Sequence, residues 1–110
     1  MAVERMRQVN EVIHRLVAEI VQREVEMPLG VLATITHVTT TRDLKDAKVY
    51  VTVLPDAKRV SGMRALQARR GHIQRLFGQR VRLKYTPKLQ FVFDEGIIKA
   101  QHVYDVMDRQ

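Results

Sequence analysis

Residues 31–54 read VLATITHVTTTRDLKDAKVYVTVL, and this stretch decides the fold. Both ends are rich in β-branched residues, and in the second half Val49, Val51 and Val53 alternate with Tyr50 and Thr52. Alternation with a period of two is typical of a half-buried strand. The polar stretch TRDLKD between the halves is too short for anything but a turn, so we expect two neighbouring antiparallel strands.

Helical patterns surround this hairpin. Residues 3–25 place apolar side chains at steps of three and four, which predicts an amphipathic helix. Ser61 is a candidate N-cap for a second helix that continues to Phe77, with Gly71 expected to bend it. Residues 81–85 fit a strand or more helix, residues 89–94 predict a third strand, and residues 97–107 could form a short closing helix.

The order α-β-β-α-kink-α-β predicts an α+β fold, a three-stranded sheet with helices packed on one face. This order matches the topology of a type II KH domain, a small RNA-binding fold. The length of 110 residues predicts one domain over residues 1–110. The chain has no cysteine, no apolar run long enough to span a membrane and no secretory signal at its start, so we expect a cytoplasmic protein. Its size and charge predict a monomer.

Charge is concentrated in residues 57–93, which contain ten basic residues and no acidic one. The remaining 73 residues carry nine basic and twelve acidic side chains, so the net charge of +7 comes from this basic segment alone. Such asymmetry indicates a surface that binds a polyanion. Nucleic acid is the first candidate and an anionic membrane the second. The alternative is a basic face that is only solvated and binds no partner.

The motifs of enzymes are absent from the sequence. Four scattered histidines match no metal-ligand spacing, Ser61 is the only serine, and there is neither a Walker loop nor a GxSxG motif. We therefore expect no enzymatic activity, no cofactor, no metal site and no small-molecule substrate.

Several stretches together resemble the ribosome-binding factor A family. They are RDLKDAKVYV at 42–51, ALQARRGHI at 65–73 with RVRL at 80–83, and TPKLQF at 86–91 followed by Asp94. The resemblance implies a KH-like fold without a GxxG phosphate clamp, and this sequence has no GxxG. It also implies an Ala-x-Gly kink between the central helices, where this chain has Arg69, Arg70 and Gly71, so that an arginine replaces the alanine.

The resemblance further implies a function. Such a factor binds free small (30S) ribosomal subunits, contacts 16S rRNA, assists late maturation and processing of that rRNA, and is needed most in the cold. The alternative is a general KH-like module that binds single-stranded RNA without ribosome specificity, and a protein-interaction or membrane-surface domain is a third possibility.

The kink supplies a physical reason for phosphate binding. A helix that begins after Gly71 points its free N–H groups and the positive end of its dipole toward the kink. Arginine side chains beside that end can each hold two phosphate oxygens. The predicted RNA-binding residues are Arg69, Arg70, Gly71, Arg75, Arg80, Arg82, Lys84 and Lys88.

Aromatic residues interleave poorly with the basic ones. Phe91 and Phe93 alternate like core residues, and Tyr85 is the best candidate to stack on a base. The sequence therefore predicts recognition of RNA shape and backbone more than of bases.

Overall fold

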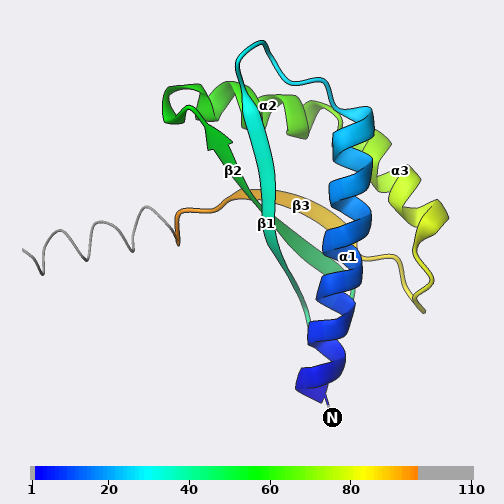
Figure 1. Cartoon of the computed structure of the whole chain (residues 1–110). Coiled ribbons are helices and arrows are strands. Elements are labelled where there is room, and N and C mark those ends of the chain that lie inside the picture. The colour runs from blue at the N-terminus through cyan, green and yellow to red at the C-terminus, as the bar shows by residue number, and fades with distance from the viewer. Residues whose placement is uncertain (1, 97–110) are drawn as a thin grey trace, which may run out of the picture.

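The computed structural model describes residues 2–96, which fold into helices and strands arranged around one sheet (Figure 1). The elements are α1 (Ala2–Glu24), β1 (Leu32–Thr40), β2 (Asp46–Leu54), the short 3-10 turn η1 (Asp56–Lys58), α2 (Arg59–Ala68), α3 (Arg70–Arg80) and β3 (Lys88–Phe93). This order confirms the predicted α+β arrangement. The closing helix expected at residues 97–107 lies outside the described residues.

The three strands form one mixed sheet in the order β1-β2-β3. β1 and β2 pair antiparallel with Leu32 opposite Leu54, which confirms the predicted hairpin. β3 pairs parallel to β2, with Lys88 opposite Asp46. A parallel pair needs a long crossover, and η1, α2 and α3 supply it between β2 and β3. β2 is therefore the central strand, and β3 is an edge strand whose outer side faces the crossover helices.

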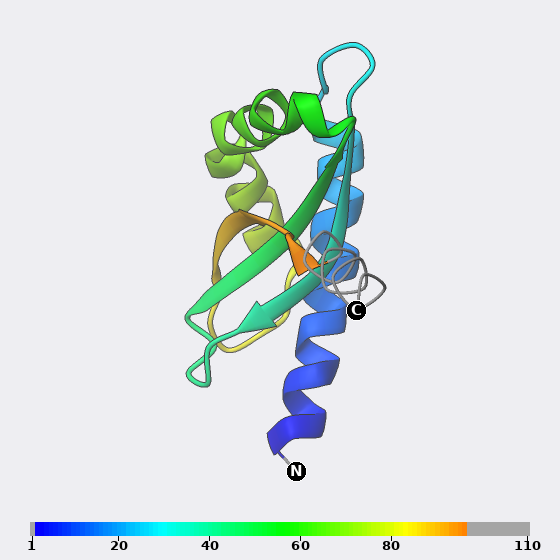
Figure 2. The same ribbon diagram turned by 90° about the vertical axis from the view of Figure 1, so that its left-hand side faces the viewer.

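One face of the sheet carries the core. On β2 the buried side chains are those of Ala47, Val49, Val51 and Val53, at every second position as the pleat requires. All three helices add apolar side chains to the same cluster: Ile13, Leu16, Val17, Ile20 and Val21 from α1, Leu66 from α2, and Ile73 and Phe77 from α3. Figures 1 and 2 show α1 running alongside β1. The helices thus cover a single face, as predicted, and Phe91 lies in the core with Phe93 packed against it.

Two details of the second helix differ from the prediction. Its N-cap is Lys58, not Ser61, because η1 already winds the chain from Asp56 and α2 continues it from Arg59. The break between α2 and α3 falls at Arg69, two residues before Gly71. Arg69 has φ −101° and ψ 3°, outside the helical range, whereas Gly71 lies within the first turn of α3. Residues 81–87 form neither strand nor helix.

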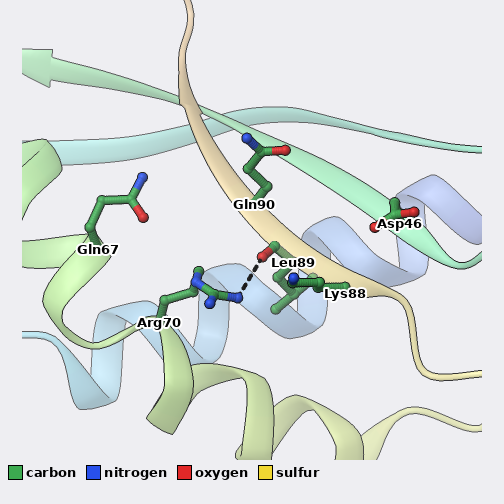
Figure 3. A pocket seen from close by; sticks show the side chains of 6 residues that line it. All are labelled: Asp46, Gln67, Arg70, Lys88, Leu89 and Gln90. Carbon is green, nitrogen blue, oxygen red and sulfur yellow. Dashed lines mark hydrogen bonds between the residues drawn. The ribbon is translucent and has the colours of Figure 1, made fainter.

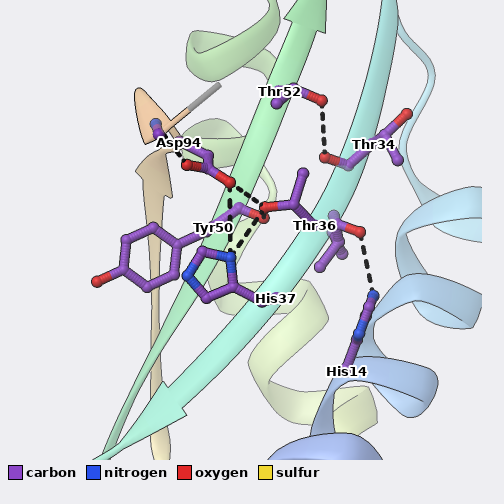
Figure 4. Close-up of polar contacts among 9 residues, drawn as sticks. His14, Thr34, Thr36, His37, Tyr50, Thr52 and Asp94 are labelled. Atoms are coloured by element: carbon purple, nitrogen blue, oxygen red, sulfur yellow. Dashed lines mark hydrogen bonds and ion pairs between the residues drawn. The ribbon is translucent and has the colours of Figure 1, made fainter. Parts of the chain in front are cut away.

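A β-bulge interrupts the hairpin at Thr36. The pairing runs from Ile35 opposite Val51 directly to His37 opposite Tyr50, so Thr36 is the extra residue. Its hydroxyl donates a 2.6 Å hydrogen bond to Asp94 Oδ2, which follows β3 (Figure 4). This hydrogen bond, with a second one from the Gly96 N–H and the nearby His37 ring, lowers the pKa of Asp94 below its ordinary value. The bulge therefore ties β1 to the end of β3 across β2.

Candidate nucleic-acid interface

The break between α2 and α3 creates an exposed helix start surrounded by positive charge. α3 begins with the hydrogen bond from the Ile73 N–H to the Arg69 carbonyl, and no side chain caps its first turn. That turn holds no acidic residue, and Arg69 is exposed beside it. The uncapped N–H groups add a partial positive charge beside the side chains of Arg69 and Arg70. The sequence predicted a break between two helices at Gly71, and the structure places it at Arg69.

A hollow of about 340 Å³ opens between the kink and the start of β3 (Figure 3). Its cationic walls are Arg70 and Lys88, which are 18 positions apart in sequence. The remaining lining is Asp46, Gln67, Leu89 and Gln90. The fold therefore brings the cationic side chains of Arg70 and Lys88 to one hollow.

Side chains from α2 and α3 bind the free edge of β3 and fix this hollow. The Gln74 side-chain N–H donates to the Pro87 carbonyl at 3.0 Å, and its oxygen accepts from the Leu89 N–H at 2.7 Å. Gln67 donates to the Phe91 carbonyl at 3.1 Å, and Arg70 donates to the Leu89 carbonyl at 3.4 Å. Edge strands expose unpaired backbone groups, and these contacts satisfy four of them, three in β3 and one at Pro87 just before it. The walls of the hollow are thereby held at a fixed separation.

Sequence reasoning missed the two glutamines. Gln67 and Gln74 look like ordinary solvent-facing helix residues, since nothing in a helical pattern indicates which strand will be at an edge. Their role depends on β3 pairing only with β2, which the sequence pattern left open. The only available signal is that a glutamine side chain carries both a donor and an acceptor, and this signal is weak.

Arg75 lies one turn after Gly71 on the exposed face of α3. Its guanidinium donates to His72 Nδ1 at 3.1 Å, and His72 Nε2 lies 3.2 Å from Glu24 Oε2 on α1. Because an arginine can only donate, His72 Nδ1 is the acceptor of this hydrogen bond, and Nε2 is the ring nitrogen that faces Glu24. One N–H of Arg75 is thus engaged, and its other donors remain available to a ligand.

The remaining predicted basic residues lie toward the far end of α3. Arg80 forms an ion pair with Glu19 of α1 at 2.6 Å, and this hydrogen-bonded guanidinium lowers the pKa of the Glu19 carboxyl. Arg80 stands roughly 15 Å along the helix axis from Arg70. Arg82 and Lys84 follow α3 and are exposed, with the Lys84 ammonium 5.5 Å from the Tyr85 ring. The eight predicted residues therefore form two groups, and in the group near the kink Arg70 and Lys88 line the hollow.

Gly71 has no structural requirement for glycine. Its φ is not in the left-handed region, and a Cβ built there meets no heavy atom within 4 Å. We predict that Gly71→Ala raises the free energy of unfolding by up to about 1 kcal/mol, because alanine is the better helix former. If a phosphate approaches the backbone closely at Gly71, the added methyl group of the same variant also weakens RNA binding. Urea unfolding and RNA titration of the one variant separate these effects; a loss of stability would contradict the prediction.

Other chemistry finds little support in residues 2–96. No group of three histidine, cysteine, aspartate or glutamate side chains in this part of the chain could hold a metal ion. His14 Nε2 bonds the Ile35 carbonyl at 3.0 Å, and His37 and His72 each lie beside one carboxylate. Each described histidine thus has a partner within the fold. None of the helices within the described range is long and apolar enough to cross a membrane.

Comparison with known proteins gives consistent similarities. The family model described as ribosome-binding factor A matches residues 5–107. A ribosome-binding factor A from Acetivibrio thermocellus is 36% identical over 102 residues, covering 91% of this chain and 83% of the relative. One from Coxiella burnetii is 32% identical over 106 residues, covering 96% and 89%.

Solved structures are similar as well. The crystal structure of ribosome-binding factor A from Thermus thermophilus matches with a TM-score of 0.70 and 24% identity, over 80% of this chain and 93% of that one. A homology model of the Thermus thermophilus factor, fitted into a cryo-EM map of its complex with 30S, matches with a TM-score of 0.64 and 26% identity. That match covers 77% of this chain and 90% of the other.

Proposed function

Because the chain belongs to the ribosome-binding factor A family, we propose that it binds free small (30S) ribosomal subunits and contacts 16S rRNA through the basic segment. Its binding would assist the late maturation and processing of that rRNA, with the greatest need in the cold. The protein would act in the cytoplasm as a monomer and without catalysis.

The observation that carries this proposal is the hollow at the kink. Arg70 and Lys88 line it from two elements, and the exposed Arg69 stands next to Arg70 at the uncapped start of α3. Arginine forks, an ammonium group and a helix N-terminus all favour phosphate oxygens. RNA backbone phosphates are spaced regularly, so a surface with several such groups binds RNA more strongly than an isolated anion.

Such binding can assist maturation without chemistry. A protein that binds one RNA arrangement more tightly than another shifts the population toward the first by its difference in affinity. A preference of about 1.4 kcal/mol changes the ratio of two arrangements tenfold. The rigid walls of the hollow, fixed by Gln67 and Gln74, suit this role because they favour a single RNA geometry.

Sedimentation tests the proposal directly. Extract from cells that make the protein would be run through a density gradient at moderate salt, and the protein followed across the fractions. We expect it to migrate with free small subunits and not with complete ribosomes, since an assembly factor must leave before translation. Purified small subunits mixed with purified protein provide the matched binding measurement.

The other hypotheses give different results in the same gradient. A protein that stays at the top but binds RNA when purified would be a general KH-like RNA-binding module. A protein that stays at the top and binds no RNA would contradict both proposals, and would favour a protein partner or an anionic membrane surface.

A further inference from the structure

The face of the sheet opposite the core carries an ordered set of polar and aromatic side chains. Strand pairing places Thr39, Lys48 and Gln90 in one row across the three strands, and His37, Tyr50 and Val92 in the next. The core lies on the other face, and α1, α2 and α3 all contribute to it. Among residues 2–96, therefore, no helix packs over these two rows.

Tyr50 and His37 form a stacked aromatic pair on this face (Figure 4). Their ring centroids are 4.1 Å apart and their planes differ by 9°. The His37 side chain is 51% exposed, and its Nδ1 lies 3.5 Å from Asp94 Oδ2, which Thr36 also holds. The bulge at Thr36 thus fixes the histidine ring, and the histidine ring supports the tyrosine ring. Such a pair is a rigid platform that is already in place before a ligand binds.

A second hollow, of about 410 Å³, adjoins this platform. Its lining consists of Tyr50, Lys48, Gln90 and Asp46, together with Ala47 and threonines 39–41. Asp46 and Gln90 also line the hollow at the kink. The two hollows therefore meet at the start of β2 and β3. An RNA strand bound at Arg70 and Lys88 can continue from there onto the open face.

The residues of this second hollow match the parts of a nucleotide. A tyrosine ring stacks on a base of any identity, and a lysine neutralises a phosphate. The Gln90 amide both donates and accepts on a base edge, and the Asp46 carboxylate accepts from an exocyclic amino group. A hydrophobic protein segment fits less well, since Val92 is the only aliphatic side chain in the two rows.

We propose that the open face of the sheet binds one unpaired RNA nucleotide, with its base stacked on Tyr50 and its phosphate at Lys48. The proposal deepens the proposed function and rests on it, because the RNA strand arrives from the kink hollow. It adds base stacking to a surface that otherwise recognises only backbone. It also assigns the stacking role to Tyr50 in place of Tyr85, the sequence-based candidate.

The tyrosines of the chain make this proposal directly measurable. The chain contains no tryptophan and three tyrosines, at positions 50, 85 and 104. The double variant Tyr85→Phe/Tyr104→Phe leaves Tyr50 as the only tyrosine, so that tyrosine emission reports on this side chain alone. Titration with single-stranded oligoadenylate of about eight nucleotides is expected to quench its emission, because stacking brings the base against the ring.

Affinity provides a second and independent readout. Tyr50→Ala is expected to weaken oligoadenylate binding about 5- to 150-fold, the range for loss of one stacked base. Tyr50→Phe keeps the ring and is expected to bind within about twofold of the original protein, because stacking and not the hydroxyl provides the affinity. Thr52→Ala lies on the same face outside the hollow and is the matched control, with no change expected. Oligouridylate, which lacks an exocyclic amino group, is expected to bind less well than oligoadenylate.

Two results would overturn the proposal. One is unchanged Tyr50 emission and unchanged affinity of Tyr50→Ala while oligoadenylate still binds, since the strand would then lie elsewhere. The other is no oligoadenylate binding by a protein that still binds small subunits. Neither result would contradict RNA binding at the kink. A protein that binds neither the oligonucleotide nor the subunit would overturn the proposed function itself.

Discussion

Replacing Arg69 and Lys88 together by glutamate is expected to weaken binding to small ribosomal subunits about 100-fold or more. Both side chains are exposed, Arg69 at the kink and Lys88 at the start of β3 beside it, and neither has an intramolecular partner among the described residues. Two charged hydrogen bonds to phosphate are worth at least about 1.5 kcal/mol each, or roughly 3 kcal/mol together. Glutamates would also repel the phosphates. Binding would be measured by titrating labelled protein with purified subunits, and folding by thermal unfolding, which is expected to be unchanged.

A matched control separates the local effect from the change in total charge. Each arginine- or lysine-to-glutamate change removes two units of charge, so the pair lowers the net charge from +7 to +3. Arg5→Glu with Arg42→Glu makes the same change at exposed positions outside the basic segment, and is expected to weaken binding far less. The kink pair should also reduce the slope of log affinity against log salt by roughly 0.7 to 0.9 per lost contact. Equal losses in the two pairs would show that only net charge matters and that the kink is not the site.

The fold was largely predictable because its strongest elements carry local signals. The hairpin alternates with a period of two around a polar turn, and α1 has a long apolar stripe, so both were found within about two residues of their observed bounds. The start of α2 was not, because Ser61 looks like a cap while η1 begins the helical winding at Asp56. The break was similarly predicted at Gly71, because glycine disfavours helix, whereas Arg69 is the residue with the non-helical backbone. Local residue preferences indicate roughly where a helix begins or ends, but neighbouring turns and packing determine the exact residue.

The candidate site was predictable in charge and not in geometry. The basic segment is visible in one dimension, but the proximity of Arg70 to Lys88 depends on β3 returning parallel to β2 beside α3. Arg80 looked equivalent to its neighbours until the packing of α3 on α1 placed it against Glu19. The aromatic platform was hidden for a similar reason. Tyr50 and His37 become partners only through a bulge, and alternation alone does not locate a bulge.

Phe77→Ala is expected to lower the free energy of unfolding by about 3 to 5 kcal/mol, the usual range for truncating a buried phenylalanine. The side chain is fully buried on the inner face of α3, in the cluster that joins all three helices to the sheet. A domain of this size typically has only about 5 to 15 kcal/mol of total stability. Urea unfolding followed by far-ultraviolet circular dichroism would measure the loss.

Two further variants on α3 serve as controls for this loss of stability. Phe77→Leu keeps most of the volume and is expected to lose about 1.5 kcal/mol or less, while Gln79→Ala at an exposed position should stay within about 0.5 kcal/mol. Because Phe77 is buried and out of reach of RNA, subunit binding by Phe77→Ala should fall only in proportion to its folded fraction. The kink pair should show the reverse, with binding lost and stability kept. A fully folded Phe77→Ala protein that has lost binding would mean that the position of α3 is set by this one side chain, and that charge alone does not make the site.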